Sequence, residues 1–94
     1  MKSFKLGQIV QTRTIYNKCK EDTNFYKEVV SAFNRYIKCD WGDLCDSDKE
    51  LNEMSLNPNN EGRILAKYNT SYEPIYIITE WDRSTTTILF CDEY

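Results

Sequence analysis

The strongest constraint on the fold is a run of helical periodicity over residues 24–38. Apolar residues recur there at intervals of three and four, the spacing that places side chains along one side of an α-helix. We expect Thr23 or Asn24 to cap this helix, because both side chains accept hydrogen bonds from backbone N–H groups. A helix with one apolar side must bury it, so this one should lie on a sheet. The stripe comprises Phe25, Val29, Ala32, Phe33, Tyr36 and Ile37.

The last third of the chain has the character of strands. Residues 63–70 largely alternate apolar and polar side chains, and residues 74–80 and 84–91 are rich in β-branched and aromatic types. A short polar turn at residues 81–83 would join the last two runs as a hairpin. The three runs therefore predict an antiparallel meander with 74–80 at its centre, and residues 8–14 predict a first strand at an edge.

A second, shorter helix is predicted over residues 48–56. Ser47 and Glu50 have the spacing of a capping box, in which each side chain bonds the other residue's backbone amide. Pro58 disfavours helical backbone at the residue before it and ends the helix. The buried side would carry Leu51 and either Met54 or Ser55.

Together these elements predict an α+β fold in a single domain over residues 1–94. A three- to four-stranded antiparallel sheet would be packed by one long and one short helix, with residues 18–22 as a polar connection. The long helix covers one face of the sheet. The other face carries threonine, tyrosine and charge, so it is either solvated or an interface.

Composition indicates a chain that folds and stays in the cytosol. Hydrophobic residues make up 40% of the 94 residues and aromatics 14%, which is too apolar for a disordered chain. No segment reaches the roughly 18 apolar residues of a membrane span. The first residues include two lysines but lack the apolar core of a signal peptide. We therefore expect reduced thiols at Cys19, Cys39, Cys45 and Cys91.

Charge is divided unevenly along the chain. Residues 1–39 hold eight Lys and Arg against three Asp and Glu, whereas residues 40–94 hold four against twelve. Such asymmetry either marks basic and acidic binding faces or simply solvates the outer surface.

Several kinds of catalytic site are excluded or disfavoured by residue type. Histidine is absent, which removes Ser-His and Cys-His nucleophilic pairs and histidine-containing zinc sites. The cysteines lack the spacing of a zinc site, and no glycine-rich phosphate loop occurs. The carboxylates from Asp40 to Glu50 lack the ligand order of a calcium loop. We expect no metal, no cofactor and no enzymatic activity.

Two polar segments remain as candidate binding sites. Aspartates in the first segment could also favour the dipole of the short helix, and Asp82 and Arg83 in the second could simply build the turn. Trp and Arg are enriched at interface anchors, which favours recognition. The candidate residues are Asp40, Trp41, Asp43, Asp46, Asp48 and Glu50 in the first segment, and Glu80, Trp81, Asp82 and Arg83 in the second.

Several motifs resemble a family of small, largely uncharacterised proteins from bacterial plasmids, phages and other mobile elements, labelled "plasmid-related". The resemblance covers most of the chain. It departs from the family pattern at Arg35-Tyr36, where the family has Arg-His, and at Cys39, Tyr76 and Cys91, where it has Gly, Trp and Pro. The matching segments are LGQIV (6–10), DWGDL (40–44), Asp48, Asn52, RILAKY (63–68), IITEWDRSTTTILF (77–90) and DEY (92–94).

This resemblance implies a mobile-element context, in which small proteins often block host defence complexes. We therefore expect a stoichiometric inhibitor of a host defence nuclease complex, similar to anti-CRISPR proteins, with a Cas effector as the type of partner and without membrane binding. The alternative is a nucleic-acid-binding accessory factor that uses the basic first third. A metal-dependent nuclease is the third possibility.

Overall fold

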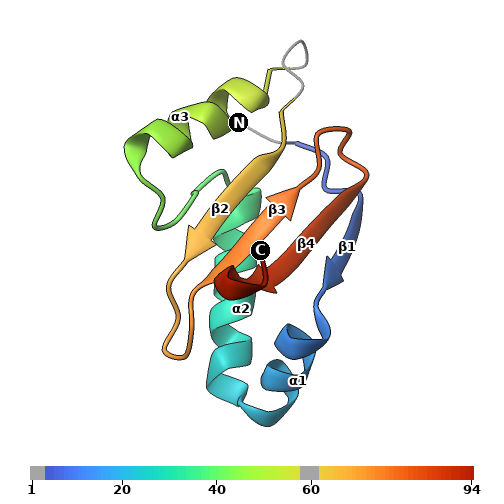
Figure 1. The fold of residues 1–94 in the computed structure, drawn as a ribbon, viewed down its shortest axis with the longest axis vertical. Coiled ribbons are helices and arrows are strands. Elements are labelled where there is room, and N and C mark those ends of the chain that lie inside the picture. Colours follow the sequence, from blue (N-terminus) through green and yellow to red (C-terminus); the bar gives the residue numbers. More distant parts are fainter. Residues whose placement is uncertain (1–3, 58–61) are drawn as a thin grey trace.

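A four-stranded sheet with a long helix across one face forms the body of the protein in the computed structural model (Figure 1). The structure describes residues 4–57 and 62–94. The helices are α1 (Arg13–Glu21), α2 (Thr23–Ile37) and α3 (Asp46–Ser55), followed at the C-terminal end by a 3-10 turn, η1 (Cys91–Glu93). The strands are β1 (Gln8–Gln11), β2 (Ile64–Tyr68), β3 (Ile75–Thr79) and β4 (Thr85–Phe90). The predicted α+β fold is confirmed.

The C-terminal meander is also confirmed, but the direction of the first strand differs from the prediction. In the sheet order β1-β4-β3-β2, β3 is central and antiparallel to both β2 and β4. β1 lies at the edge as expected, yet it pairs with β4 in parallel. Parallel neighbours need a long connection between them, and here the helices, β2 and β3 all intervene. The sheet is therefore mixed.

Helix α1 takes the place of the end of the strand predicted over residues 8–14 and of most of the polar connection predicted over residues 18–22. The strand stops at Gln11, and the Thr12 hydroxyl caps α1 by accepting from the backbone N–H of Ile15 at 3.4 Å. Ile15 is the one fully buried residue of α1, so the helix has almost no apolar stripe to reveal it in the sequence. The Glu93 carboxylate accepts hydrogen bonds from the hydroxyls of Thr12 and Thr14, which ties α1 to the C-terminal turn.

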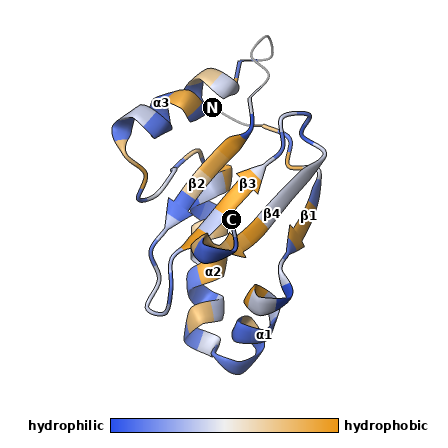
Figure 2. Ribbon diagram, in the orientation of Figure 1, coloured by the Kyte–Doolittle hydropathy of each residue, from blue (hydrophilic) through white to orange (hydrophobic). Residues whose placement is uncertain are grey.

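Helix α2 confirms the main prediction with a shift at its start. It begins at Thr23, and Asp22 caps it by accepting from the N–H of Phe25 at 3.1 Å. Phe25, Val29, Ala32 and Tyr36 are buried against the sheet, whereas Ile37 stays exposed. Figure 2 shows the apolar strands against which this side of α2 packs. The core is therefore a helix stripe on the inner face of β2, β3 and β4.

A chain of buried hydroxyl groups crosses this core. The hydroxyl of Tyr36 lies 2.6 Å from that of Thr79, which in turn lies 2.8 Å from that of Thr86. Thr86 donates to the backbone carbonyl of Leu6 at 2.7 Å. Burial raises the pKa of Tyr36 well above its usual range. Every member has a partner, so the network holds the N-terminal segment, α2 and the sheet together without an unpaired polar atom.

The outer edge of β2 is closed by side-chain and loop hydrogen bonds. The Asn52 side-chain amide donates to the carbonyl of Leu65 at 2.7 Å and accepts from its N–H at 3.1 Å. Lys67 donates to the carbonyl of Trp41 and accepts from the N–H of Asp43. Gly42 allows this approach, since its φ is +76° and a Cβ there would overlap the Lys67 carbonyl. The edge is thus unable to pair with another strand.

The side of α3 that faces the protein is not the predicted one. The helix begins at Asp46 after Cys45, and no side chain caps it, so the capping box of Ser47 and Glu50 does not form. The predicted burial of Leu51 is wrong, since it is 59% exposed, and of the two alternatives beside it Met54 is 57% exposed whereas Ser55 is half-buried. Asn52 is the buried residue of α3, because the open edge of β2 needs its amide. The predicted terminator, Pro58, lies outside the described residues.

This arrangement makes Asn52 more important for stability than its apolar neighbour. Asn52→Ala leaves a backbone donor and an acceptor of Leu65 unpaired, so we expect the free energy of unfolding to fall by about 2 kcal/mol. Leu51→Ala is the matched control on the same helix and should change it by less than about 0.5 kcal/mol. Urea denaturation of both variants measures the difference. An equal loss in the two variants would contradict the role assigned to Asn52.

Candidate partner-binding surface

The first predicted binding segment begins with residues that are used inside the fold. Asp40 forms a two-point ion pair with Arg35, with Nε–Oδ2 at 2.8 Å and Nη2–Oδ1 at 3.2 Å. The hydroxyl of Tyr68 donates to the carbonyl of Asp40 at 2.7 Å. Trp41 is buried beside Tyr36, and its Nε1 donates to Glu53 at 2.7 Å. The structure thus places Trp41 in the core, where it is not available to a partner.

Asp43 also serves the local structure, although its side chain is exposed. Its carboxylate accepts from the N–H of Asn69 at 2.9 Å, and its own N–H bonds the edge of β2. Asp40 and Asp43 therefore fasten the loop between α2 and α3 to the sheet. Substituting either would disturb that loop as well as any surface charge.

The second predicted segment forms the β3–β4 turn, and its Arg83 is a structural clamp. Arg83 has a positive φ of 60°. Its guanidinium donates to the carbonyls of Gly62 at 2.8 Å and Ser55 at 2.6 Å, and also to those of Glu80 and Trp81. The turn is thereby tied to the C-terminal end of α3. Arg83 therefore builds the turn through contacts with backbone carbonyl groups.

Asp82 and Trp81 have separate roles in the same turn. The Asp82 carboxylate accepts from the N–H of Ser84 at 3.0 Å, and hydrogen bonding to Ser84 lowers the pKa of Asp82. Glu80 is half-buried, and its carbonyl accepts from the N–H of Arg83. Trp81 is 58% exposed and is the residue of this segment that offers a large apolar surface to a partner.

The remaining acidic candidates of the first segment lie on exposed positions of α3. Asp46, Glu50 and Met54 follow one another at four-residue intervals, so they form a row along the helix. Asp48 is exposed as well and accepts from the Cys45 thiol at 3.2 Å. We call the α3 surface the set Asp46, Asp48, Glu50, Leu51 and Met54.

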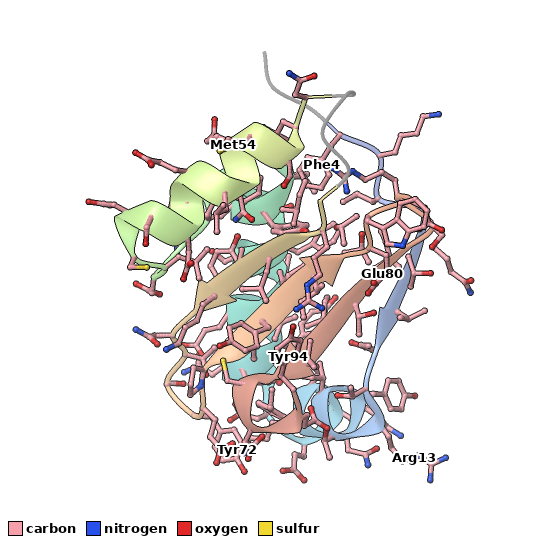
Figure 3. All side chains as sticks on the ribbon, turned by 45° about the horizontal axis from the view of Figure 1, so that its top comes forward. Phe4, Arg13, Met54, Tyr72, Glu80 and Tyr94 are labelled. Carbon is pink, nitrogen blue, oxygen red and sulfur yellow. The ribbon has the colours of Figure 1, made fainter. Side chains whose placement is uncertain are left out.

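A groove runs beside the α3 surface, between α3 and the sheet face opposite α2. Its volume is about 480 Å³, and Asp48 and Leu51 line its α3 side. Leu65 and Tyr76 form its floor on β2 and β3. Tyr94 packs on Tyr76 of this floor, with the two ring centroids 5.5 Å apart. Figure 3 shows Tyr94 over this face and Met54 on α3.

The basic first third is partly neutralised by internal contacts. Lys18 pairs with Glu21 and Asp22 and lies 4.1 Å from the ring centre of Tyr72, while Arg35 is held by Asp40. Exposed cations remain at Lys5, Arg13, Lys20, Lys27 and Lys38.

Within residues 4–57 and 62–94, no cluster of three or more Cys, Asp or Glu side chains could hold a metal ion. None of the described helices is both long and apolar enough to cross a bilayer. All four cysteines are free thiols, and burial raises the pKa of Cys19 and of Cys91. No protein-family model, curated protein or solved structure matches the chain.

The Arg35–Asp40 pair predicts a measurable pH dependence. The hydrogen bond from Arg35 holds the pKa of Asp40 below its usual value, so the pair contributes stability above that value and loses it as the pH falls. Asp40→Asn should lower the free energy of unfolding at neutral pH by less than about 1 kcal/mol, because both side chains are about half exposed.

Wild type and Asp40→Asn should then converge as the pH falls from about 5 to 3. Urea denaturation at several pH values provides the measurement, with Glu73→Gln in an exposed loop as the control. A difference between wild type and Asp40→Asn that stays constant with pH would contradict the assignment.

Proposed function

We propose that the chain is a protein-binding inhibitor that uses the α3 surface to dock on a host defence nuclease, with a Cas effector as the type of target. The observation that carries the proposal is the orientation of α3. The helix is held through Asn52, Glu53 and Ser55, and this attachment leaves Leu51 and Met54 exposed beside three acidic residues.

The chemistry of this surface fits a basic partner that also carries apolar groups. Leucine and methionine side chains supply area that is removed from water on binding. Asp46, Asp48 and Glu50 supply negative charge that would be attracted to a positively charged patch. Proteins that handle nucleic acid carry such patches, because they must neutralise phosphates. The family resemblance adds the mobile-element context.

The groove beside the α3 surface could accept a side chain of the partner. Leu51 and Asp48 line one wall of the groove, so a partner side chain could enter it while contacting the α3 surface. The turn that carries Trp81 lies beside the C-terminal end of α3, because Arg83 binds the Ser55 carbonyl there. Of the two predicted segments, the acidic residues of α3 and Trp81 are therefore the parts that could contact a partner together. Asp40, Trp41 and Arg83 would act by supporting this surface.

The proposal predicts inhibition that depends on the α3 carboxylates. Purified protein should block DNA cleavage by a susceptible Cas effector in a stoichiometric manner. Asp46→Lys/Glu50→Lys reverses charge at two exposed positions and should weaken binding at least roughly tenfold. Glu73→Lys/Asp92→Lys makes the same change in net charge at exposed positions away from α3, and it should leave inhibition intact.

Binding measured by calorimetry at increasing salt provides a second readout, because attraction between exposed charges is screened. If the two double variants inhibit equally, the α3 surface is not the interface. If the wild-type protein inhibits none of the effectors and instead binds DNA with a steep salt dependence, the basic first third is the functional site and the inhibitor proposal fails.

A further inference from the structure

The two edges of the sheet differ in a way that points to a second partner surface. The edge of β2 is closed by Asn52 and the loop before α3, as described above. On the other edge, the N–H of Gln8 in β1 donates to the carbonyl of Ser84 at 2.9 Å, and the N–H of Thr12 donates to the carbonyl of Ile88 in β4 at 3.1 Å. Because backbone groups alternate in direction along a strand, those of Ile9 and Gln11 point away from β4.

These outward groups are ready to pair. Among the described residues, none of the hydrogen bonds uses the N–H or C=O of Ile9 or Gln11. Figure 1 shows β1 at the margin of the sheet with no element beyond it. The side chain of Ile9 is 51% exposed at the same place. An open strand edge with an exposed apolar side chain is a template for another strand.

We infer that β1 pairs antiparallel with β1 of a second copy of this chain, forming a continuous eight-stranded sheet across a two-fold axis at Val10. In this register Ile9 lies opposite Gln11 of the second copy, and each such pair exchanges two backbone hydrogen bonds. All four outward groups of each strand are then satisfied.

The flanking backbone selects this register. Shifting the axis to Ile9 would require Gly7 to pair with Gln11, but Gly7 has a φ of +65° and is not extended. Shifting the axis to Gln11 would require Arg13 to pair with Ile9, but Arg13 is already helical. The register centred on Val10 uses strand residues alone for its hydrogen-bonded pairs. It also places the two Val10 side chains directly opposite each other, where apolar pairs stabilise a sheet.

The side chains on the helix-covered face are complementary in the same register. Gln11 lines a mostly apolar pocket of about 370 Å³ with Tyr16, Cys19 and Lys20 of α1 and Tyr26 and Val29 of α2. Ile9 of the second copy would lie opposite Gln11 on this face, about 5.5 Å away along the pairing direction. Its exposed side chain would therefore enter the pocket. Each copy offers both the side chain and the pocket, as a two-fold interface requires.

Charge favours the same occupant. Antiparallel pairing brings the end of one β1, which Arg13 follows, beside the start of the other, where Gly7 is packed against Ser84 at the end of the β3–β4 turn. That turn carries the exposed Asp82. The dimer would thus bring an exposed cation of one copy near an exposed anion of the other, twice.

Sedimentation equilibrium over a range of protein concentrations tests this inference. The wild-type protein should approach twice its 11.2 kDa mass as concentration rises. Ile9→Lys should remain a monomer, because it places a positive charge against the mostly apolar pocket and beside Lys20 in its lining. Val30→Lys introduces the same residue at an exposed apolar position of α2 outside this pocket and should dimerise like the wild type. Circular dichroism confirms that each variant is folded.

Two further measurements keep the test decisive if Ile9→Lys fails to fold. Amide hydrogen exchange followed by NMR should show protection of the Ile9 and Gln11 N–H groups that increases with protein concentration. Arg13→Glu and Asp82→Lys should each weaken the dimer, and the double variant should restore it. A wild-type monomer at every concentration, or rapid exchange of both amides in a dimer, would overturn the inference.

Discussion

Hydrogen bonds on the outer edge of β2 set the position of α3 and of the loop before it. A strand edge exposes donors and acceptors that must be paired or left to water. Here Asn52 takes those of Leu65, and the loop around Gly42 takes those of Lys67. These contacts position α3 beside the sheet and direct Leu51 and Met54 outward. They also leave the edge of β1 as the place where the sheet can grow.

The charged residues of the chain divide into two groups with different consequences. Asp22, Asp40, Asp43, Asp82 and Glu93 accept hydrogen bonds from neighbouring groups and so build caps, loops and turns. Asp46 and Glu50 follow Asp40 and Asp43 closely in the sequence, but they form a second group because they lie on the exposed side of α3. The carboxylates of the first group keep their charge, but substituting them would also disturb the local structure that they hold. The location of the second group is what gives α3 its proposed role.

The sheet and its main helix could be predicted because their signals are local and repetitive. The stripe from Phe25 to Tyr36 and the β-branched runs in the last third each match one structural period. Helix α1 could not be predicted in this way, because Ile15 is its one fully buried side chain. The parallel pairing of β1 was also missed, since strand direction depends on the path of the chain between β1 and β4.

The candidate sites also combine features that local sequence patterns predict with features that depend on the folded chain. The α+β class, the hairpin turn at residues 81–83 and the concentration of acidic residues before β2 can all be read from the order of residue types. The burial of Trp41, the clamping of α3 by Arg83 and the inward position of Asn52 in place of Leu51 emerge only from the folded chain. Periodicity indicates which residues are apolar, but it does not indicate which polar residues are needed inside. The unpaired backbone groups of an edge strand determine which polar residue must turn inward, and they lie far away in the sequence.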